Sequence, residues 1–334
     1  MRRSDIHALV GDIGGTNARF AVMALDEGRP SIICARSVLC RDYASLAQAA
    51  DAFLASTNLT VRPALATIAV AGPVADGAAR LTNVAWDASE TELLGLGFAQ
   101  ARLVNDFEAL ATGVADLAPE DSVSIGADRP GLTGAPMLVA GAGTGFGLAG
   151  LVRHPAGEVQ VIASEGGHAS FAPVDDIEIE ILRALRGKHG RVSIERLLSG
   201  PGLLDLYGIM AEILALPAAP SVTPEDVTAA ALNSRDPLSV AVLEQFCAVF
   251  GSVAGDAALS FGARGGVFLA GGLVAGIAPF LEFSRFRQRF EAKGRLSGLM
   301  QGTPTRVIVQ THTALIGAAR IAQGLVAREF HATS

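Results

Sequence analysis

The chain has 334 residues, of which 50% are apolar, 18% are charged and 38 are glycine. This length favours two domains, and the composition is typical of an α/β protein rather than a disordered chain. The formal net charge of −7 argues against nucleic acid as the main partner, because binding to a phosphate backbone requires a basic surface.

The cysteines and the uncharged runs bear on the compartment. Cys34, Cys40 and Cys247 match neither a disulfide framework nor a zinc site. Free cysteines are typical of a reducing compartment, so we expect a cytoplasmic protein. Two long runs, Pro130–Val152 and Gly265–Leu281, carry no charge. Glycines interrupt both, and buried strands explain them better than lipid-spanning helices, so we expect no membrane partner.

Strands and helices alternate over the first third of the chain. Two apolar runs, Ala8–Asp12 and Ala18–Met23, predict strands joined by a Gly-Gly-Thr-Asn turn at residues 14–17. Asp42 can cap a helix whose apolar stripe begins at Leu46. The other elements expected in this part are a strand at Leu65–Ala71, a strand over Arg102–Asn105 and a helix that opens at Asp106.

A second glycine-rich turn lies within Met137–Leu151 and repeats the plan of the first. Each has an apolar run, a turn that contains Gly-Thr and a second apolar run, which predicts a duplicated unit. The segment Pro119–Pro136, rich in Pro, Gly, Asp and Ser, predicts a linker or long loop. The remaining expected elements are helices at Ile177–Leu185, Ser193–Leu198, Gly202–Leu216 and Pro237–Gly262, and a strand at Gly266–Ala270.

Residues 283–295 form a segment rich in basic residues. We interpret it as an amphipathic helix with a solvated basic face, in preference to a membrane or phosphate-binding patch. Three phenylalanines interleave with its basic side chains, which are Arg285, Arg287, Arg289, Lys293 and Arg295.

The two glycine turns offer backbone N–H groups that no side chain obstructs. Neither is a P-loop, because no Gly-Lys-Ser/Thr follows, and neither fits the dinucleotide fingerprint. Their amides, with a hydroxyl from Thr16 or Thr144, suit a polyphosphate held between two facing turns. A carboxylate beside a phosphate needs a cation between them, so Asp12 is the candidate ligand of Mg²⁺. The alternative is a tight hairpin turn in which Asp12 bonds its own backbone.

Three other segments carry side chains suited to catalysis or sugar binding. Asn105 and Asp106 lie where a strand leads into a helix; a carboxylate there can act as general base on a hydroxyl, although Asp is also a favoured N-cap. Glu165 and His168 flank a Gly-Gly turn, and their side chains suit vicinal sugar hydroxyls. One alternative is an exposed turn with two incidental polar residues. Another is a metal site, although no third ligand stands at a recognised spacing. Glu195 falls in a first helical turn, where the helix dipole alone favours a carboxylate.

The order of these motifs is more specific than any one of them. Between about Ala8 and Gly317 the chain contains, in this order, LVGDIGGTNARFAV, TNVAW, VNDFEALA, GAGTGFGLA, SEGGHASFAP, ERLLSGPGL and GGVFLAGGL. With these motifs in this order, the chain resembles the bacterial glucokinase family. The resemblance implies an α/β chain with the two-domain ribonuclease H-like/actin-type ATPase fold and a central cleft.

The resemblance also implies a domain division and a reaction. Residues 1–112 plus 313–334 are expected to form a small α/β domain, and residues 113–312 a large one. The implied reaction is ATP-dependent phosphorylation of glucose to glucose 6-phosphate with Mg²⁺, in a cytoplasmic homodimer. The alternatives are a kinase of another hexose (mannose, fructose or N-acetylhexosamine), a sugar sensor without turnover and, more remotely, a nucleotide-hydrolysing actin-like assembly protein.

Residue roles follow from the match to the family's motifs. Asp106 is expected to take the proton from the glucose 6-hydroxyl, and the remaining hydroxyls are expected to bind Asn105, Glu165, His168 and Glu195. The nucleotide positions lie in or beside the glycine-rich turns, with Asp12 toward Mg²⁺. They are Gly11, Asp12, Ile13, Gly14, Gly15, Thr16, Gly143, Thr144, Gly145, Gly271 and Gly272.

Two positions depart from the family pattern. Ser164 stands where glycine is expected before the sugar loop, and Thr311–Gly317 lacks the Asn-Pro-Gly expected at the entry to the C-terminal helix. The second departure leaves the start of that helix open. The zinc signature CxCGxxGC of the other bacterial sugar-kinase group, which has repressor members, is absent from the sequence, and this weakens an assignment to that group.

Overall fold

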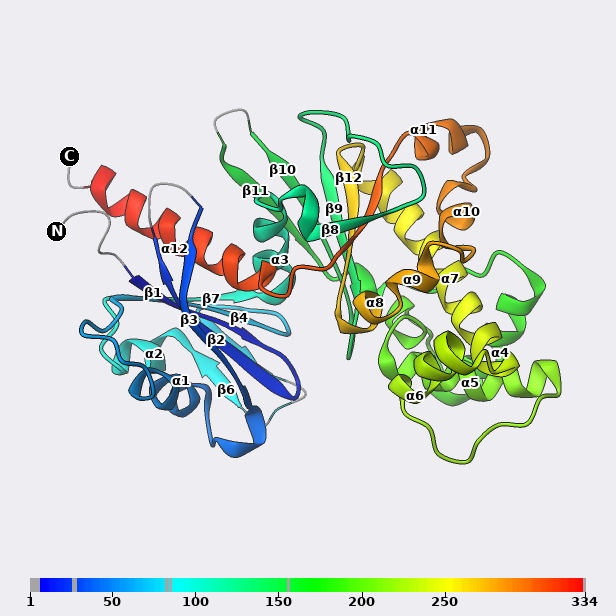
Figure 1. Cartoon of the computed structure of the whole chain (residues 1–334), viewed down its shortest axis with the longest axis horizontal. Helices are drawn as coiled ribbons and strands as arrows, with labels where there is room; N and C mark the ends of the chain where they lie inside the picture. The colour runs from blue at the N-terminus through cyan, green and yellow to red at the C-terminus, as the bar shows by residue number, and fades with distance from the viewer. Residues whose placement is uncertain (1–6, 26–28, 82–83, 85, 155–156, 333–334) are drawn as a thin grey trace. The chain divides into compact units, whose positions relative to one another are not determined.

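The computed structural model describes the chain except for residues 1–6, 26–28, 82–83, 85, 155–156 and 333–334. The chain divides into two compact units. The first comprises Met1–Ala118, Val159–Ala163 and Gln310–Ser334, and the second comprises Pro119–Glu158 and Ser164–Val309. Strands and helices mix throughout the described residues, which confirms the expected α/β class (Figure 1).

The first sheet has five strands in the order β3(Ser31–Leu39), β2(Asn17–Ala24), β1(His7–Ile13), β4(Leu65–Val70) and β7(Gln100–Asn105). β1 pairs antiparallel with β2 and parallel with β4, and β4 pairs parallel with β7. All of β4 is buried, as expected for a strand covered on both faces. The strands predicted from the apolar runs are therefore confirmed. A separate ribbon pairs β5(Ala78–Arg80) with β6(Asp87–Ser89).

Helices cover both faces of this sheet (Figure 1). Alternation along β1 decides which residue meets which face, because successive side chains of a strand point to opposite sides. Leu9 packs in the core that contains α1(Leu46–Ala55) and Leu93 of α2(Glu90–Gly95). Ala8 and Val10 pack instead in the core of α3(Asp106–Val114) and α12(Thr313–Ala332).

The cap of α1 differs from the prediction. The Ser45 side chain accepts a hydrogen bond from the backbone N–H of Gln48 at 3.1 Å and caps the helix. Asp42 lies in the preceding 3-10 turn, η2(Cys40–Asp42). The prediction that Asp42 caps this helix is wrong, because the chain completes that turn before the helix begins.

The C-terminal helix α12 begins at Thr313, despite the missing Asn-Pro-Gly. The Thr313 hydroxyl donates to the carbonyl of Gln310 at 3.1 Å. α12 then packs closely on α3: a Cβ at Gly317 would lie 1.8 Å from the Ala109 carbonyl oxygen. Glycine at this position allows the two helices to approach to backbone contact.

The second sheet repeats the plan of the first. Its order is β11(Val159–Ser164), β10(Phe146–Arg153), β9(Met137–Ala142), β12(Gly266–Ala270), β13(Thr305–Ile308) and β8(Ser122–Ile125). β9 pairs antiparallel with β10 and parallel with β12, which pairs parallel with β13. In both sheets a glycine-turn hairpin thus adjoins two further parallel strands, as expected for a duplicated unit.

The segment Pro119–Pro136 is more structured than predicted. It contains the 3-10 turn η3(Pro119–Asp121) and β8, which pairs antiparallel with β13 as an edge strand. The Thr305 hydroxyl also donates to the Ile125 carbonyl at 2.7 Å. The prediction of a linker or loop over this whole segment is therefore wrong, because the partner strand lies far along the sequence.

The second unit is rich in helices. The central one is α7(Pro237–Phe261), whose Phe246 and Phe250 are fully buried. Within the described residues it is the one helix with the length and hydropathy of a membrane span, and 83% of its most apolar stretch is buried inside the structure. The others are α4(Asp176–His189), α5(Gly200–Leu214), α6(Pro224–Ala229), the π turn η6(Ala230–Ser234), α8(Gly272–Gly276), α9(Ala278–Leu281), α10(Phe286–Glu291) and α11(Ser297–Gln301), with 3-10 turns η4(Gly166–His168), η5(Ile194–Arg196) and η7(Gly294–Leu296).

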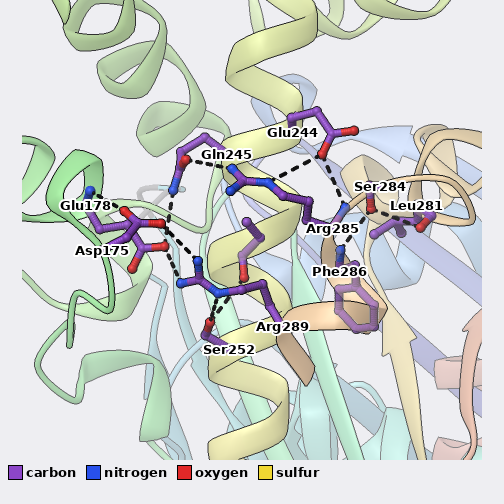
Figure 2. Close-up of polar contacts among 11 residues, drawn as sticks. Asp175, Glu178, Glu244, Gln245, Ser252, Leu281, Ser284, Arg285, Phe286 and Arg289 are labelled. Atoms are coloured by element: carbon purple, nitrogen blue, oxygen red, sulfur yellow. Dashed lines mark hydrogen bonds and ion pairs between the residues drawn. The ribbon is translucent and has the colours of Figure 1, made fainter. Parts of the chain in front are cut away.

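Basic side chains of the segment 283–295 point into the second unit (Figure 2). Arg289, on α10, is only 12% exposed. Its guanidinium binds Asp175 at 3.0 Å, pairs with Glu178 and donates to Ser252 at 3.0 Å. Glu178 is completely buried and also accepts from the Gln245 amide at 3.2 Å. This cluster joins α4, α7 and α10.

Two neighbours of Arg289 are bonded in the same way. Arg287 donates to the carbonyls of Met300 and Thr303 at 3.0 and 2.9 Å. Lys293 is 9% exposed and binds the Ser252 carbonyl at 3.0 Å and Asp256 at 2.6 Å. The prediction of a solvated basic face is therefore wrong for Arg287, Arg289 and Lys293, because acidic and carbonyl groups from distant segments meet these charges inside the fold. Arg295 is exposed and Arg285 is 41% exposed.

The substitution Arg289→Ala is expected to lower the free energy of unfolding by about 3–5 kcal/mol, because it leaves the buried carboxylate of Glu178 without its cation. Arg183→Ala removes the same side chain from an exposed pair with Glu180 and should cost less than about 1 kcal/mol. Urea denaturation of both variants measures the difference. Equal losses would contradict a stabilising role of the buried pair.

Candidate active site

The β1–β2 turn is closed through its carbonyl groups. Gly14 N–H donates to the Asn17 carbonyl at 3.0 Å, and Cys40 N–H donates to the Thr16 carbonyl at 2.9 Å. The Cys40 thiol lies 3.7 Å from the Gly14 carbonyl as a donor. Three carbonyl oxygens are thus bound to protein groups, which reduces their repulsion of a phosphate beside the turn.

Cys40 is a structural residue that the sequence analysis missed. The sequence indicates only a free thiol, yet the backbone and the side chain of Cys40 both bond to the first glycine turn. Burial raises the pKa of the thiol, so it stays protonated and able to donate. No local motif marks this role, since Cys40 and Gly14 are 26 positions apart.

Asp12 lies near the end of β1, opposite Arg19 of β2. Its side chain is 24% exposed, and Oδ2 lies 3.5 Å from the Arg19 guanidinium. Burial raises the pKa of Asp12, and the positive charge of Arg19 opposes that rise. The carboxylate is thus paired across the hairpin in a place where burial makes a second cation favourable.

Asn105, not Asp106, caps α3. The Asn105 side-chain oxygen accepts from the N–H groups of Phe107 and Glu108 at 2.9 and 3.3 Å, and its amide donates to the Gly72 carbonyl at 3.1 Å. The amide carries one further N–H beyond this bond. The cap alternative for Asp106 is therefore wrong. Asp106 is the first residue of α3, and its Oδ1 accepts from Phe107 N–H at 3.0 Å.

The first turn and Asp106 lie at the same edge of the first sheet. β1, β4 and β7 are parallel, and their last residues are in register: Ile13 pairs with Val70, which pairs with Asn105. Asp106 follows directly, while the turn follows Ile13. The carboxyl edge of a parallel sheet is the usual place for functional side chains. The first unit therefore brings a candidate phosphate turn and a candidate base to one edge.

The second turn has an equivalent place in the second sheet. Gly143 N–H donates to the Gly145 carbonyl at 2.9 Å, and Thr144 is exposed at the tip. Gly271 follows β12, which runs parallel to β9, and its φ is +101°. A Cβ there would lie 2.1 Å from the Ala142 carbonyl oxygen, so only glycine fits. Gly271 and Gly272 are exposed at this edge.

Glu165 and His168 lie together on the exposed loop around η4. Gly167 packs on the strand beneath, where a Cβ would lie 2.0 Å from the Phe146 carbonyl oxygen. The Ser164 hydroxyl accepts from Gly166 N–H at 3.0 Å. The departure at Ser164 therefore supplies a local bond that shapes the loop and leaves both candidate sugar residues in place.

Glu195 does more than complement a helix dipole. The helix expected at Ser193–Leu198 is only the three-residue turn η5. The Glu195 carboxylate instead accepts from the backbone N–H of Phe146 at 2.9 Å. The fold of the second unit thus brings Glu195 to the second glycine turn. The local sequence around Glu195 does not indicate this contact.

The metal-pair alternative for Glu165 and His168 gains no support. Among the residues that the structure describes, no group of three or more His, Cys, Asp or Glu side chains could hold a metal ion. A single carboxylate such as that of Asp12 fits a cation that takes most of its ligands from phosphate and water. In the TNVAW motif, Thr82, Asn83 and Ala85 lie outside the described residues.

Comparison with known proteins matches this arrangement to one family. The glucokinase family model matches residues 9–325. The chain belongs to the glucokinase family. It is 48% identical over 312 residues to a glucokinase of Caulobacter sp. strain K31, with 93% of each chain covered.

Solved structures of glucokinases share the fold. A glucokinase from an Antarctic psychrotroph has a TM-score of 0.81 at 37% identity, covering 94% of this chain and 97% of its own. A glucokinase from Balamuthia mandrillaris, solved in complex with glucose, has a TM-score of 0.82 at 22% identity, covering 95% and 94%. The second likeness extends to the fold alone.

Asp12→Asn is expected to raise the free energy of unfolding at pH 7. The folded pKa of Asp12 is raised, so its charged form costs stability above that pKa, and the variant lacks the charge. The gain should shrink as the pH falls through the raised pKa toward 3.8, the ordinary value, where the wild type carries the proton. Urea denaturation at several pH values measures the gain. A less stable variant at pH 7 would show that the Arg19 pair dominates.

Proposed function

We propose that the chain is a glucokinase that transfers the terminal phosphoryl group of ATP to the 6-hydroxyl of glucose. One observation carries the proposal: a glycine turn suited to phosphate and the carboxylate of Asp106 follow parallel strands at one edge of the first sheet. Family membership and the 48% identity to the Caulobacter glucokinase support the choice of sugar.

The proposal extends to the family's ribonuclease H-like/actin-type ATPase fold with its central cleft. The shared strand plan of the two sheets supports this fold. The domain division proposed with it is residues 1–112 plus 313–334 and residues 113–312. A cytoplasmic location, expected from the cysteine pattern, and a homodimer, implied by the family resemblance, complete the proposal.

In the proposed reaction, Asp106 accepts the proton of the 6-hydroxyl as the oxygen bonds to the terminal phosphorus of ATP, whose bond to the bridging oxygen breaks so that ADP leaves. Asn105, Glu165, His168 and Glu195 hold the other hydroxyls. Amides of the two glycine turns stabilise the charge that spreads over the transferred group. The proposed nucleotide positions in or beside these turns are Gly11, Ile13, Gly14, Gly15, Thr16, Gly143, Thr144 and Gly145, while Gly271 and Gly272 adjoin the adenosine.

Mg²⁺, when bound with ATP, would neutralise part of the phosphate charge. Asp12 is the proposed residue on the metal side. A single carboxylate suits this ion, which keeps several waters and binds phosphate oxygens in nucleotide sites. The raised pKa of Asp12 fits this role, because a cation beside the buried carboxylate would favour its charged form.

Asp106→Asn is expected to lower kcat by about 10²–10⁴-fold, the usual contribution of a general base, with little change in glucose affinity. Asn105 supplies the cap of α3, so the helix should remain folded. Glu108→Gln is the matched control, since it removes another carboxylate from the same first turn. An Asp106→Asn variant with the kcat of the control would show that Asp106 is not the base.

The sugar is tested by coupled detection of ADP release from Mg-ATP. Glucose, mannose, fructose, N-acetylglucosamine and no sugar are compared. We expect strong turnover with glucose and little with the others, because a site built to bond particular hydroxyls rejects sugars that lack or misplace them. Faster turnover of another sugar would indicate a different hexose kinase, and glucose binding without turnover would indicate a sensor.

A further inference from the structure

Glu195 and Gly200 hold the two ends of the second glycine turn. The Glu195 carboxylate accepts from the N–H of Phe146, the residue directly after the turn, at 2.9 Å. Before the tip, the Gly143 carbonyl accepts from Gly200 N–H at 2.8 Å. The short segment 195–200 therefore clamps the turn from both sides.

Gly145 has no room for a side chain because of Glu195. A Cβ at Gly145 would lie 2.5 Å from Oε2 of Glu195. The φ of Gly145 is outside the left-handed region, so the backbone itself accepts alanine. A methyl group here would displace the flexible end of Glu195 rather than the strand. At Gly143, in the same turn, a Cβ meets nothing within 4 Å.

The loop that carries His168 is tied to the Glu195 segment. Ile194 N–H donates to the Ala169 carbonyl at 2.9 Å, and Phe171 N–H donates to the Val192 carbonyl at 3.1 Å. The Arg191 guanidinium also donates to the His168 carbonyl at 2.6 Å. These hydrogen bonds connect the His168 loop directly to the segment that leads to Glu195.

We propose that Glu195 couples the two substrate sites of the second unit. One carboxylate oxygen fastens the phosphate turn through Phe146, while the same side chain binds the sugar; the latter role rests on the proposed function. Glu195 is then a positioning residue for the turn as well as a sugar ligand. A change in the turn should weaken glucose binding, and a change in the reach of Glu195 should weaken nucleotide binding.

The first test alters the turn and measures the sugar. Gly145→Ala should weaken glucose binding about tenfold or more in the absence of nucleotide, because the methyl group displaces a charged hydrogen-bonding group. Gly143→Ala makes the same chemical change in the same turn and should stay within about twofold of wild type. Isothermal titration gives both dissociation constants. Equal effects of the two variants would overturn the coupling.

The second test alters Glu195 and measures the nucleotide. Glu195→Gln keeps an acceptor at the same reach from Phe146, whereas Glu195→Asp keeps the charge but withdraws it by one methylene. Without glucose, Mg-ATP should bind several-fold more weakly to the Asp variant than to the Gln variant. Unchanged Mg-ATP affinity in both would show that Glu195 is only a sugar ligand and would overturn the coupling.

The two proposals fail in different ways. A wild type that binds glucose and turns it over, with Gly145→Ala equal to Gly143→Ala, overturns the coupling and leaves the proposed function standing. A wild type that neither binds nor phosphorylates glucose overturns the proposed function and the coupling with it. Circular dichroism melting of each variant checks that a lost affinity is not lost folding, because a variant with wild-type melting and weaker binding supports the coupling.

Discussion

A backbone turn presents its amides to a polyanion more favourably when its carbonyl oxygens are bound elsewhere, and carbonyls of both glycine turns of this protein are bound to other protein groups. Cys40 binds the carbonyls of Gly14 and Thr16 in the first turn, and Gly200 binds the carbonyl of Gly143 in the second. Phosphate binding at such turns comes from main-chain dipoles rather than from cationic side chains. A chain with a net charge of −7 can therefore still be proposed to hold a polyphosphate.

The sheets place these turns at the carboxyl ends of parallel strands, the usual place for functional groups in such sheets. Each turn joins two antiparallel strands, β1 to β2 and β9 to β10, and the first strand of each pair runs parallel to a further strand of its sheet. Segments that follow the parallel strands therefore meet at one edge of the sheet. Asp106 reaches the edge of the first sheet in this way, and Gly271 that of the second. Within the second unit, Glu195 links the proposed sugar and phosphate contacts through one backbone N–H. Positioning of the reactants and electrostatic stabilisation, rather than covalent chemistry by the protein, account for most of the catalysis of phosphoryl transfer.

Charges in the interior stabilise the second unit rather than forming a binding surface. Arg289 joins α10 to α4 and α7, and its partner Glu178 is fully buried. Burying an isolated charge costs folding free energy, so each charged group of the cluster offsets the cost of burying its partners. Part of the basic segment predicted to face solvent thus lies in the core, where Phe286 and Phe290 are fully buried, whereas Phe283 is 84% exposed.

The sequence by itself determined the α/β class, most strands and the glycine turns, because apolar periodicity and turn chemistry are local properties of the chain. The order of its motifs also determined the family. Only the tertiary structure decided that residues 122–125 form an edge strand, that Arg289 is buried and that Glu195 binds Phe146. Those outcomes depend on which groups fold together: Glu195 and Phe146 are 49 positions apart, Arg289 and Glu178 are 111 apart, and no local pattern encodes a partner at that separation.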